Sequence, residues 1–197
     1  EGHYNRKGLK TILKNNFTAS EPELRNIWGT YYEGIAATNS LINGLKSSPL
    51  EESIKKGFLA DAYFLRAFIY FDIQKAFGGK EGIPMPLDDT IEKLLPRTAG
   101  IDVYKKIIAD LEYAEQFLPD GSASVSGRAS KGAARGLIAR AYLYIAGEPF
   151  NEPGAYESAR IWSKKVIDDA YYKLNPSYAD VFNQLAMEQY DKQEVLF

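Results

Sequence analysis

Residues 57–79 read GFLADAYFLRAFIYFDIQKAFGG, and this stretch predicts a helix that is buried on most of its sides. At about 100° per residue, its aromatic side chains fall into two stripes with small side chains in the groove between them. A helix that is apolar over most of its circumference requires neighbours on several sides, so we expect the central helix of a helical array. The stripes are Tyr63, Tyr70 and Phe77, and Phe64, Phe68 and Phe71; the groove holds Ala60 and Ala67.

Arg66 interrupts the apolar arc of this predicted helix, whose narrow polar edge holds Asp61, Asp72 and Lys75. A guanidinium that is removed from water must be paired or hydrogen-bonded. We therefore interpret Arg66 as a structural clamp, with a ligand contact as the alternative.

The composition of the 197-residue chain predicts a globular protein of about one domain. A hydrophobic share of 45% allows a sizeable core, and an aromatic share of 13% fits either interlocking helices or a surface that stacks on sugars or peptides. A net charge of −2 with interspersed signs argues against a nucleic-acid partner. The lack of cysteine excludes disulfides and thiolate metal sites, and no apolar run approaches the ~18 residues of a membrane span.

Helical spacing and capping signals extend the array on both sides of the central helix. The predicted helices cover 21–46, about 49–77, 101–118, 130–146, 155–170 and a short segment at 178–185. Ser20 and Ser48 each precede a Glu by three residues, which is the spacing of a capping box, and Ser130 is a predicted N-cap. Gly78 and Gly79 are expected to end the central helix. No stretch keeps the alternation of a half-buried strand for long, so the predicted class is all-α.

The segment 80–97 connects two of these helices and contains Pro84, Pro86 and Pro96. Proline excludes a regular helix here, so we expect an extended connection. Apolar residues alternate around the prolines, which favours a strap laid over the helices.

An internal repeat relates the central helix to residues 130–146. Arg66-Ala-Phe-Ile-Tyr70 and Arg140-Ala-Tyr-Leu-Tyr144 lie 74 positions apart, as do Ala60 and Ala134. This offset is close to two ~34-residue tetratricopeptide units, each a helical hairpin. We therefore predict a short right-handed superhelix of tetratricopeptide-like hairpins, and we assign Arg140 the same structural role as Arg66. The expected hairpins pair 21–46 with 49–77 and 130–146 with 155–170.

Candidate catalytic residues are scarce. His3 is the only histidine, so no histidine-based triad or two-histidine metal site can be built. Paired acids such as Asp88-Asp89 are expected in solvated caps, and a hydrolase is nearly excluded. Trp28 is a predicted core residue, and Asn39 is expected to bond neighbouring backbone.

Several motifs together resemble the SusD/RagB family of outer-membrane nutrient-binding lipoproteins. They occur in the family's order and cover nearly the whole chain. They are Trp28-x2-Tyr31-x3-Ile35-x3-Asn39, Ala60-x-Ala62-x2-Leu65-Arg66-Ala67-x2-Tyr70-Phe71, Phe77-Gly78-Gly79-x3-Ile83-Pro84, Ile108-x-Asp110-Leu111-x2-Ala114, and Arg128-Ala-Ser130-Lys-Gly-Ala133-Ala134.

This resemblance implies a non-enzymatic protein of the outer membrane, exposed at the cell surface and held by a lipid anchor that lies outside this chain. It implies that the protein captures glycans or other oligomeric nutrients and passes them to a SusC-like TonB-dependent transporter, and no cofactor is expected. Residues 1–197 would be the amino-terminal helical domain, and a larger carboxy-terminal half would supply much of the ligand site.

The resemblance also places candidate ligand contacts in the loop before the first long helix. Aromatic rings stack on sugar faces while amides bond the hydroxyls. The candidates are Tyr4 first, then His3, Asn5, Arg6, Asn15, Asn16 and Phe17. The alternative is that this loop packs on its own domain.

A second functional class fits the predicted fold, namely a tetratricopeptide adaptor that holds a partner protein in its concave groove. Such a groove would be polar and lined with cations to clamp a peptide carboxylate. The repeat helices here carry aromatics and alanines instead.

Overall fold

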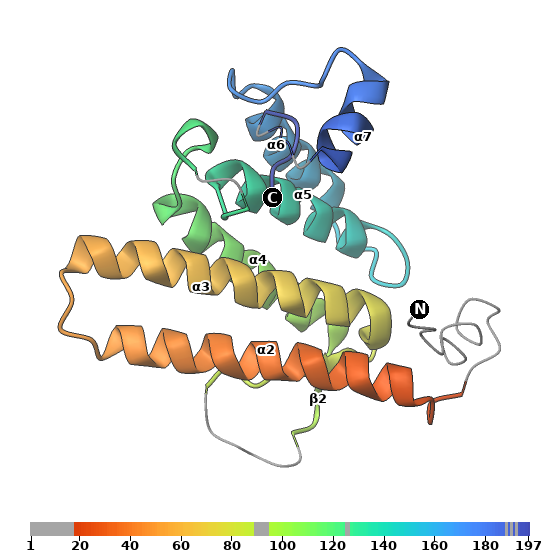
Figure 1. The fold of residues 1–197 in the computed structure, drawn as a ribbon. Helices are drawn as coiled ribbons and strands as arrows, with labels where there is room; N and C mark the ends of the chain where they lie inside the picture. Colours follow the sequence, from red (N-terminus) through yellow and green to blue (C-terminus); the bar gives the residue numbers. More distant parts are fainter. Residues whose placement is uncertain (1–17, 89–94, 125–126, 188, 190, 192) are drawn as a thin grey trace, which may run out of the picture.

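The computed structural model describes residues 18–88, 95–124, 127–187, 189, 191 and 193–197, and these residues form an array of helices (Figure 1). The elements in chain order are α2 (Pro22–Lys46), α3 (Glu52–Ile73), a π-helical turn (Gln74–Gly78), β1 (Ile83–Pro84), β2 (Arg97–Thr98), α4 (Gly100–Phe117), a 3-10 turn (Gly121–Ala123), α5 (Lys131–Ala146), α6 (Ala155–Ile167) and α7 (Tyr178–Ala186). The predicted all-α, tetratricopeptide-like fold is confirmed.

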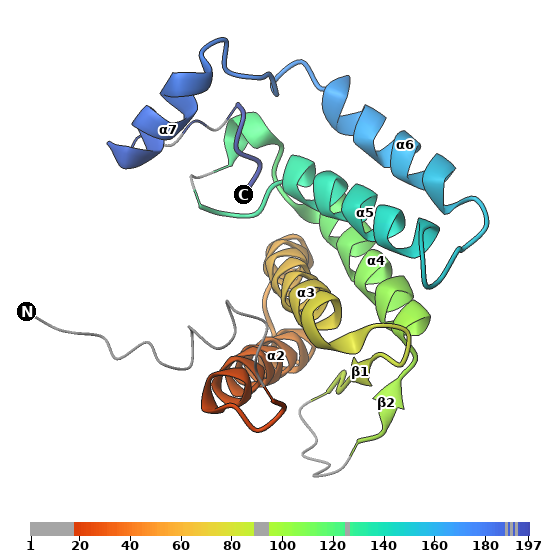
Figure 2. The same cartoon turned by 90° about the vertical axis from the view of Figure 1, so that its right-hand side faces the viewer.

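Consecutive long helices pack against one another in the order α2, α3, α4, α5, α6 (Figures 1 and 2). The two expected hairpins are present as α2 with α3 and α5 with α6, and α4 joins them by packing on both α3 and α5. The main core contains side chains from all of these helices.

The helix α3 has neighbours on several sides, as its sequence predicts. It packs on α2 and α4 and also touches α5. Ala60 and Ala67 have no exposed surface, which is consistent with their place in a groove that lets other helices approach closely. Trp28 of α2 packs half-buried against the core, with its ring 4.8 Å from Tyr32 and 5.4 Å from Phe77.

Two of the predicted helix N-caps are wrong. The helix α2 begins at Pro22 after Glu21, which forms no side-chain cap, while the Ser20 hydroxyl bonds to that of Thr18 instead. The helix α3 begins at Glu52, three residues later than expected, because the carboxylate of Glu51 takes over as the cap by accepting a hydrogen bond from the Ser53 amide.

The other helix ends follow the sequence more closely. Ser130 caps α5 as predicted, with its Oγ accepting from the Ala133 amide at 3.1 Å. The regular part of α3 ends at Ile73 and is extended by the π-helical turn to Gly78. The helix α6 ends at Ile167, three residues before the expected end.

Within its described residues 80–88 and 95–97, the connection after α3 is the extended strap that its prolines predict. The two short strands pair antiparallel, with Ile83 opposite Thr98. Gly82 has a φ of +71°, and a Cβ there would lie 1.8 Å from the Thr98 carbonyl oxygen, so only glycine fits this position. The Tyr32 hydroxyl donates to the Pro84 carbonyl at 2.6 Å, which fixes the strap to α2.

The expectation of two equivalent buried arginines holds for Arg66 and is wrong for Arg140. Arg66 is 3% exposed, and its Nε and Nη2 donate to the Asp110 carboxylate at 2.8 and 3.0 Å. Arg140 is exposed and lies over the Phe71 ring, with 5.4 Å from guanidinium carbon to ring centroid. The acidic partner that α4 provides for Arg66 has no counterpart for Arg140 among the described residues, so that guanidinium stays in water.

Candidate functional site

The ligand contacts predicted from the sequence lie outside the described residues. They are His3, Tyr4, Asn5, Arg6, Asn15, Asn16 and Phe17. These ligand contacts stay predictions.

The strongest polar cluster in the described part of the chain is centred on Arg66 and Asp110. The Arg66 Nη1 also donates to Asn39 Oδ1 at 2.9 Å, and Lys106 forms a second ion pair with Asp110. The Asn39 Nδ2 donates to the backbone carbonyls of Pro86 and Asp88, as expected for a backbone partner. These contacts tie α2, α3, α4 and the strap together. Because Arg66 and Asp110 are only 3% and 2% exposed, the cluster is closed to a ligand.

Buried tyrosines complete the attachment of the strap. The Tyr70 hydroxyl donates to the Pro86 carbonyl at 2.5 Å, and burial raises the pKa of Tyr70 well above its ordinary value. Burial also raises the pKa of Tyr32 and Tyr104. These phenols therefore remain protonated at neutral pH, and the hydroxyls of Tyr32 and Tyr70 act as hydrogen-bond donors to the strap.

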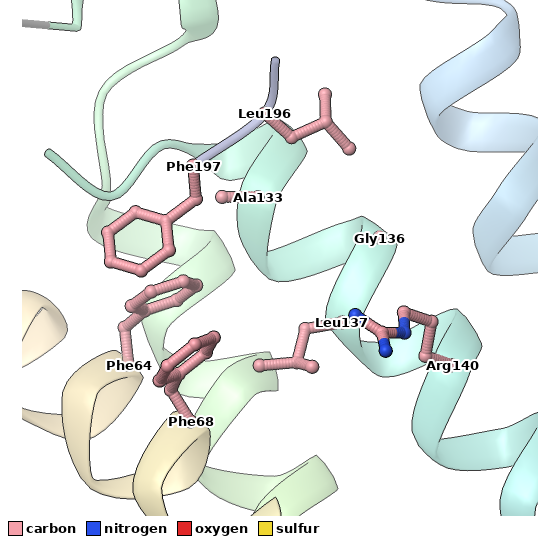
Figure 3. Close-up of a pocket in the computed structure, with 8 residues that line it drawn as sticks. All are labelled: Phe64, Phe68, Ala133, Gly136, Leu137, Arg140, Leu196 and Phe197. Carbon is pink, nitrogen blue, oxygen red and sulfur yellow. The ribbon is translucent and has the colours of Figure 1, made fainter. Parts of the chain in front are cut away.

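An aromatic hollow of about 260 Å³ opens between α3 and α5 (Figure 3). Phe64 and Phe68 line it from α3, while Leu137 and Arg140 line it from α5. Phe197 also lines it, with its ring 4.9 Å from Phe64 and 5.4 Å from Phe68.

The chemistry of this hollow is that of an apolar contact. Ala133, Gly136 and Leu196 complete the lining, so the guanidinium of Arg140 at its edge is the one charged group in it. Such a lining accommodates apolar side chains or the C–H face of a ring and offers no nucleophile or base. The aromatic stripe of Phe64 and Phe68 is evident in the sequence, but no local signal places Phe197 upon it.

The described residues hold no group of three or more acidic or histidine side chains arranged for a metal ion. The same part of the chain has no helix that is long and apolar enough to cross a membrane.

The sequence matches a known family. A model of the SusD-like family, described as starch-binding associating with outer membrane, matches residues 3–143. Because this match covers more than half of the chain, the chain belongs to the SusD-like family, and the resemblance drawn from its motifs is confirmed.

Individual relatives agree with this assignment. A SusD-like protein of Bacteroides ovatus is 30% identical over 176 residues, which cover 84% of this chain and 31% of the relative. The crystal structure of a SusD homologue from Bacteroides thetaiotaomicron has the same fold, with a TM-score of 0.85 at 23% identity over 100% of this chain and 39% of its own. A crystal structure with a xylogluco-oligosaccharide has a TM-score of 0.75 at 26% identity, over 92% of this chain and 36% of its own. The chain thus spans between 31% and 39% of the length of these proteins.

Proposed function

We propose that this chain is the amino-terminal helical domain of an outer-membrane protein that binds glycans, or other oligomeric nutrients, at the cell surface without altering them chemically. The observation that carries the proposal is the family match over residues 3–143, whose description includes starch binding and the outer membrane. The relative solved with a xylogluco-oligosaccharide, at 26% identity, supports carbohydrate as the ligand class.

The proposed role of the helical array is to hold other groups in place. Its core is closed, and Arg66 and Asp110 neutralise each other within it. Binding side chains are commonly carried by loops on a rigid scaffold, which fits the loop before α2 and a carboxy-terminal half as the sources of ligand contacts. In that loop Tyr4 is the first candidate, because a phenol ring stacks on the C–H face of a sugar and its hydroxyl bonds to water or sugar.

The proposed partner is a SusC-like TonB-dependent transporter, which receives the ligand from this protein. The protein would be attached to the outer membrane by a lipid outside this chain. Affinity capture of the intact protein from detergent-solubilised outer membranes tests the partnership, and recovery of a TonB-dependent transporter in stoichiometric amount is the expected result.

Calorimetric titration of the intact protein with malto-oligosaccharides and with xylogluco-oligosaccharides tests the ligand class. We expect saturable binding of at least one series, and we expect Tyr4→Ala to weaken it roughly threefold to tenfold, as for loss of one aromatic contact. Tyr178→Ala, which removes an exposed ring on α7, is the matched control. Binding of a peptide with a free carboxylate, together with no response to any saccharide, would replace the proposal by the adaptor function.

A further inference from the structure

A second hollow of about 320 Å³ lies among α4, α5 and the start of α6, and it shares no lining residue with the aromatic hollow of Figure 3. These three helices are consecutive in the array and are seen together in Figure 2. Its volume is at the small end of the ~300–1,000 Å³ typical of ligand sites.

The floor of this hollow is apolar. Ile108 of α4, Ile145 of α5 and Ala155 of α6 line it and are all buried. The half-buried ring of Tyr142 adds an aromatic surface and also packs against the main core. The hollow therefore presents a fixed apolar surface at its base.

Polar groups stand around this floor. The side chains of Glu112, Tyr142 and Ser158 line the hollow, and within the described part of the chain none of their side-chain oxygens has a hydrogen-bond partner. Lys105 of α4 pairs with Glu152, in the turn before α6, at 3.4 Å. A small number of convergent polar groups above an apolar base is the usual composition of a small-molecule site.

The charges select among ligand classes. One lysine and two glutamates give the lining a net charge of −1, which disfavours anions such as uronates and phosphates. A basic side chain of a partner protein would meet Lys105, which is 55% exposed at the edge. Burial, followed by the charge of Glu112, raises the pKa of Tyr142, so its hydroxyl stays protonated and is available as a donor.

We propose that this hollow is a carbohydrate subsite on the helical array, built for one neutral pyranose unit. The C–H face of the sugar packs on Tyr142 and the isoleucine floor, while its hydroxyls bond to Glu112, Ser158 and the Lys105–Glu152 pair. The inference takes its ligand class from the proposed function, but it concerns helices and not the loop before α2. A long glycan could then bind both at the ligand site of the proposed function and at this hollow. Binding at two sites increases the effective affinity without any new contact at the ligand site.

Methyl NMR of the intact protein, labelled at isoleucine δ1 positions, observes this floor directly. On titration with D-glucose, we expect saturable shifts of Ile108 and Ile145, which line the hollow, and none of Ile42 and Ile73, which are fully buried elsewhere. D-glucuronate and L-lysine at the same concentrations test the charge argument and are expected to have no effect on these two methyl groups.

Matched variants test the contacts. Ala109→Phe fills the hollow from an exposed position and should abolish the shifts, whereas Ala37→Phe, on the exposed surface of α2, should not. Tyr142→Phe removes one hydroxyl and should weaken glucose binding roughly twofold to tenfold, the range for one neutral hydrogen bond. Tyr156→Phe, which removes an exposed hydroxyl on α6, should leave it unchanged.

The outcomes separate this inference from the proposed function. If glucose does not move Ile108 and Ile145, or if L-lysine moves them as much, the pyranose subsite is wrong. If a xylogluco-oligosaccharide binds the wild type and Ala109→Phe equally well, the protein binds glycans but this hollow does not. If no saccharide binds at all, the proposed function and the subsite are both wrong.

Discussion

The helices α3 and α5 carry nearly the same sequence around their arginines, yet the structure uses them differently. The small residues Ala67 and Ala141 are fully buried in both helices. The arginine and the tyrosine of the repeat differ in solvent exposure. Arg66 and Tyr70 are buried, while Arg140 and Tyr144 are exposed.

This difference follows from what surrounds each helix. The helix α3 lies between α2 and α4 with the strap across it, and these neighbours provide Asn39, Asp110 and the Pro86 carbonyl as polar partners. The helix α5 lies between α4 and α6, and on the side of Arg140 it borders the aromatic hollow. A repeated sequence thus predicts which face packs, but the partners decide whether a polar side chain in that repeat is buried.

The largest expected effect is that of Arg66→Met, which leaves the buried Asp110 carboxylate without its main partner. Breaking a buried ion pair costs about 3–5 kcal/mol, and we expect the lower end because Lys106 still pairs with Asp110. Urea unfolding monitored by circular dichroism measures this change.

The double variant Arg66→Met with Asp110→Leu is the control for Arg66→Met. Removing both charges should restore part of the lost stability. A loss below about 0.5 kcal/mol for the single variant would mean that Arg66 and Arg140 are equivalent after all, contrary to the comparison.

Alkaline pH gives the second effect, through Tyr70 and its buried neighbours. In the folded state their pKa is raised above the unfolded value of about 10, so above that pH the unfolded chain binds fewer protons than the folded one. The free energy of unfolding should therefore be unaffected below about pH 10 and should fall as pH rises further, by up to about 1.4 kcal/mol per pH unit for each such tyrosine.

The variant Tyr70→Phe tests the contribution of that residue. It should make the fall of stability with rising pH less steep. The Pro86 carbonyl is not left unpaired in this variant, because it still accepts a hydrogen bond from Asn39. Unfolding curves at several pH values between 9 and 11 provide the measurement, and an unchanged slope would contradict the role of Tyr70.

The helix starts give a third, smaller effect. Ser130→Ala removes the side-chain cap of α5 and should cost about 1 kcal/mol of stability. Ser48→Ala should change stability by less than about 0.5 kcal/mol, because Glu51 is the cap of α3. Equal losses in the two variants, measured by thermal unfolding, would show that the sequence-based capping box is used at α3.

The smallest expected effect is that of Arg140→Met. Its guanidinium is exposed and lies over Phe71, an arrangement worth about 0.5–1 kcal/mol at most, and the methionine retains apolar contact there. We expect a change of less than about 0.5 kcal/mol by the same unfolding assay. A loss comparable to that of Arg66→Met would show that Arg140 has a buried partner in solution.

Most of the fold could be predicted from periodicity, because apolar residues at helical spacing must be covered. The positions of α2, α4, α5 and α6 and the buried face of α3 follow from that rule. The N-caps of α2 and α3 could not be predicted, because a serine at capping-box spacing caps a helix only if the local geometry brings it to the free backbone amides, and at α3 Glu51 takes that place. The aromatic hollow could be predicted only in part. Phe64 and Phe68 stand out in the sequence, but Phe197 is more than 125 positions away from both, and no local pattern predicts that it contacts them.

The amino-acid sequence alone determined an all-α array of tetratricopeptide-like hairpins, the strap at the prolines and the membership of the SusD-like family. Only the tertiary structure decided which arginine is neutralised, where the two hollows open and which polar groups are left to face a ligand. Helix formation and amphipathic burial depend on residues three or four positions apart, so they can be read locally. Ion pairing and cavities depend on side chains from different helices, and their positions are defined only when those helices have packed.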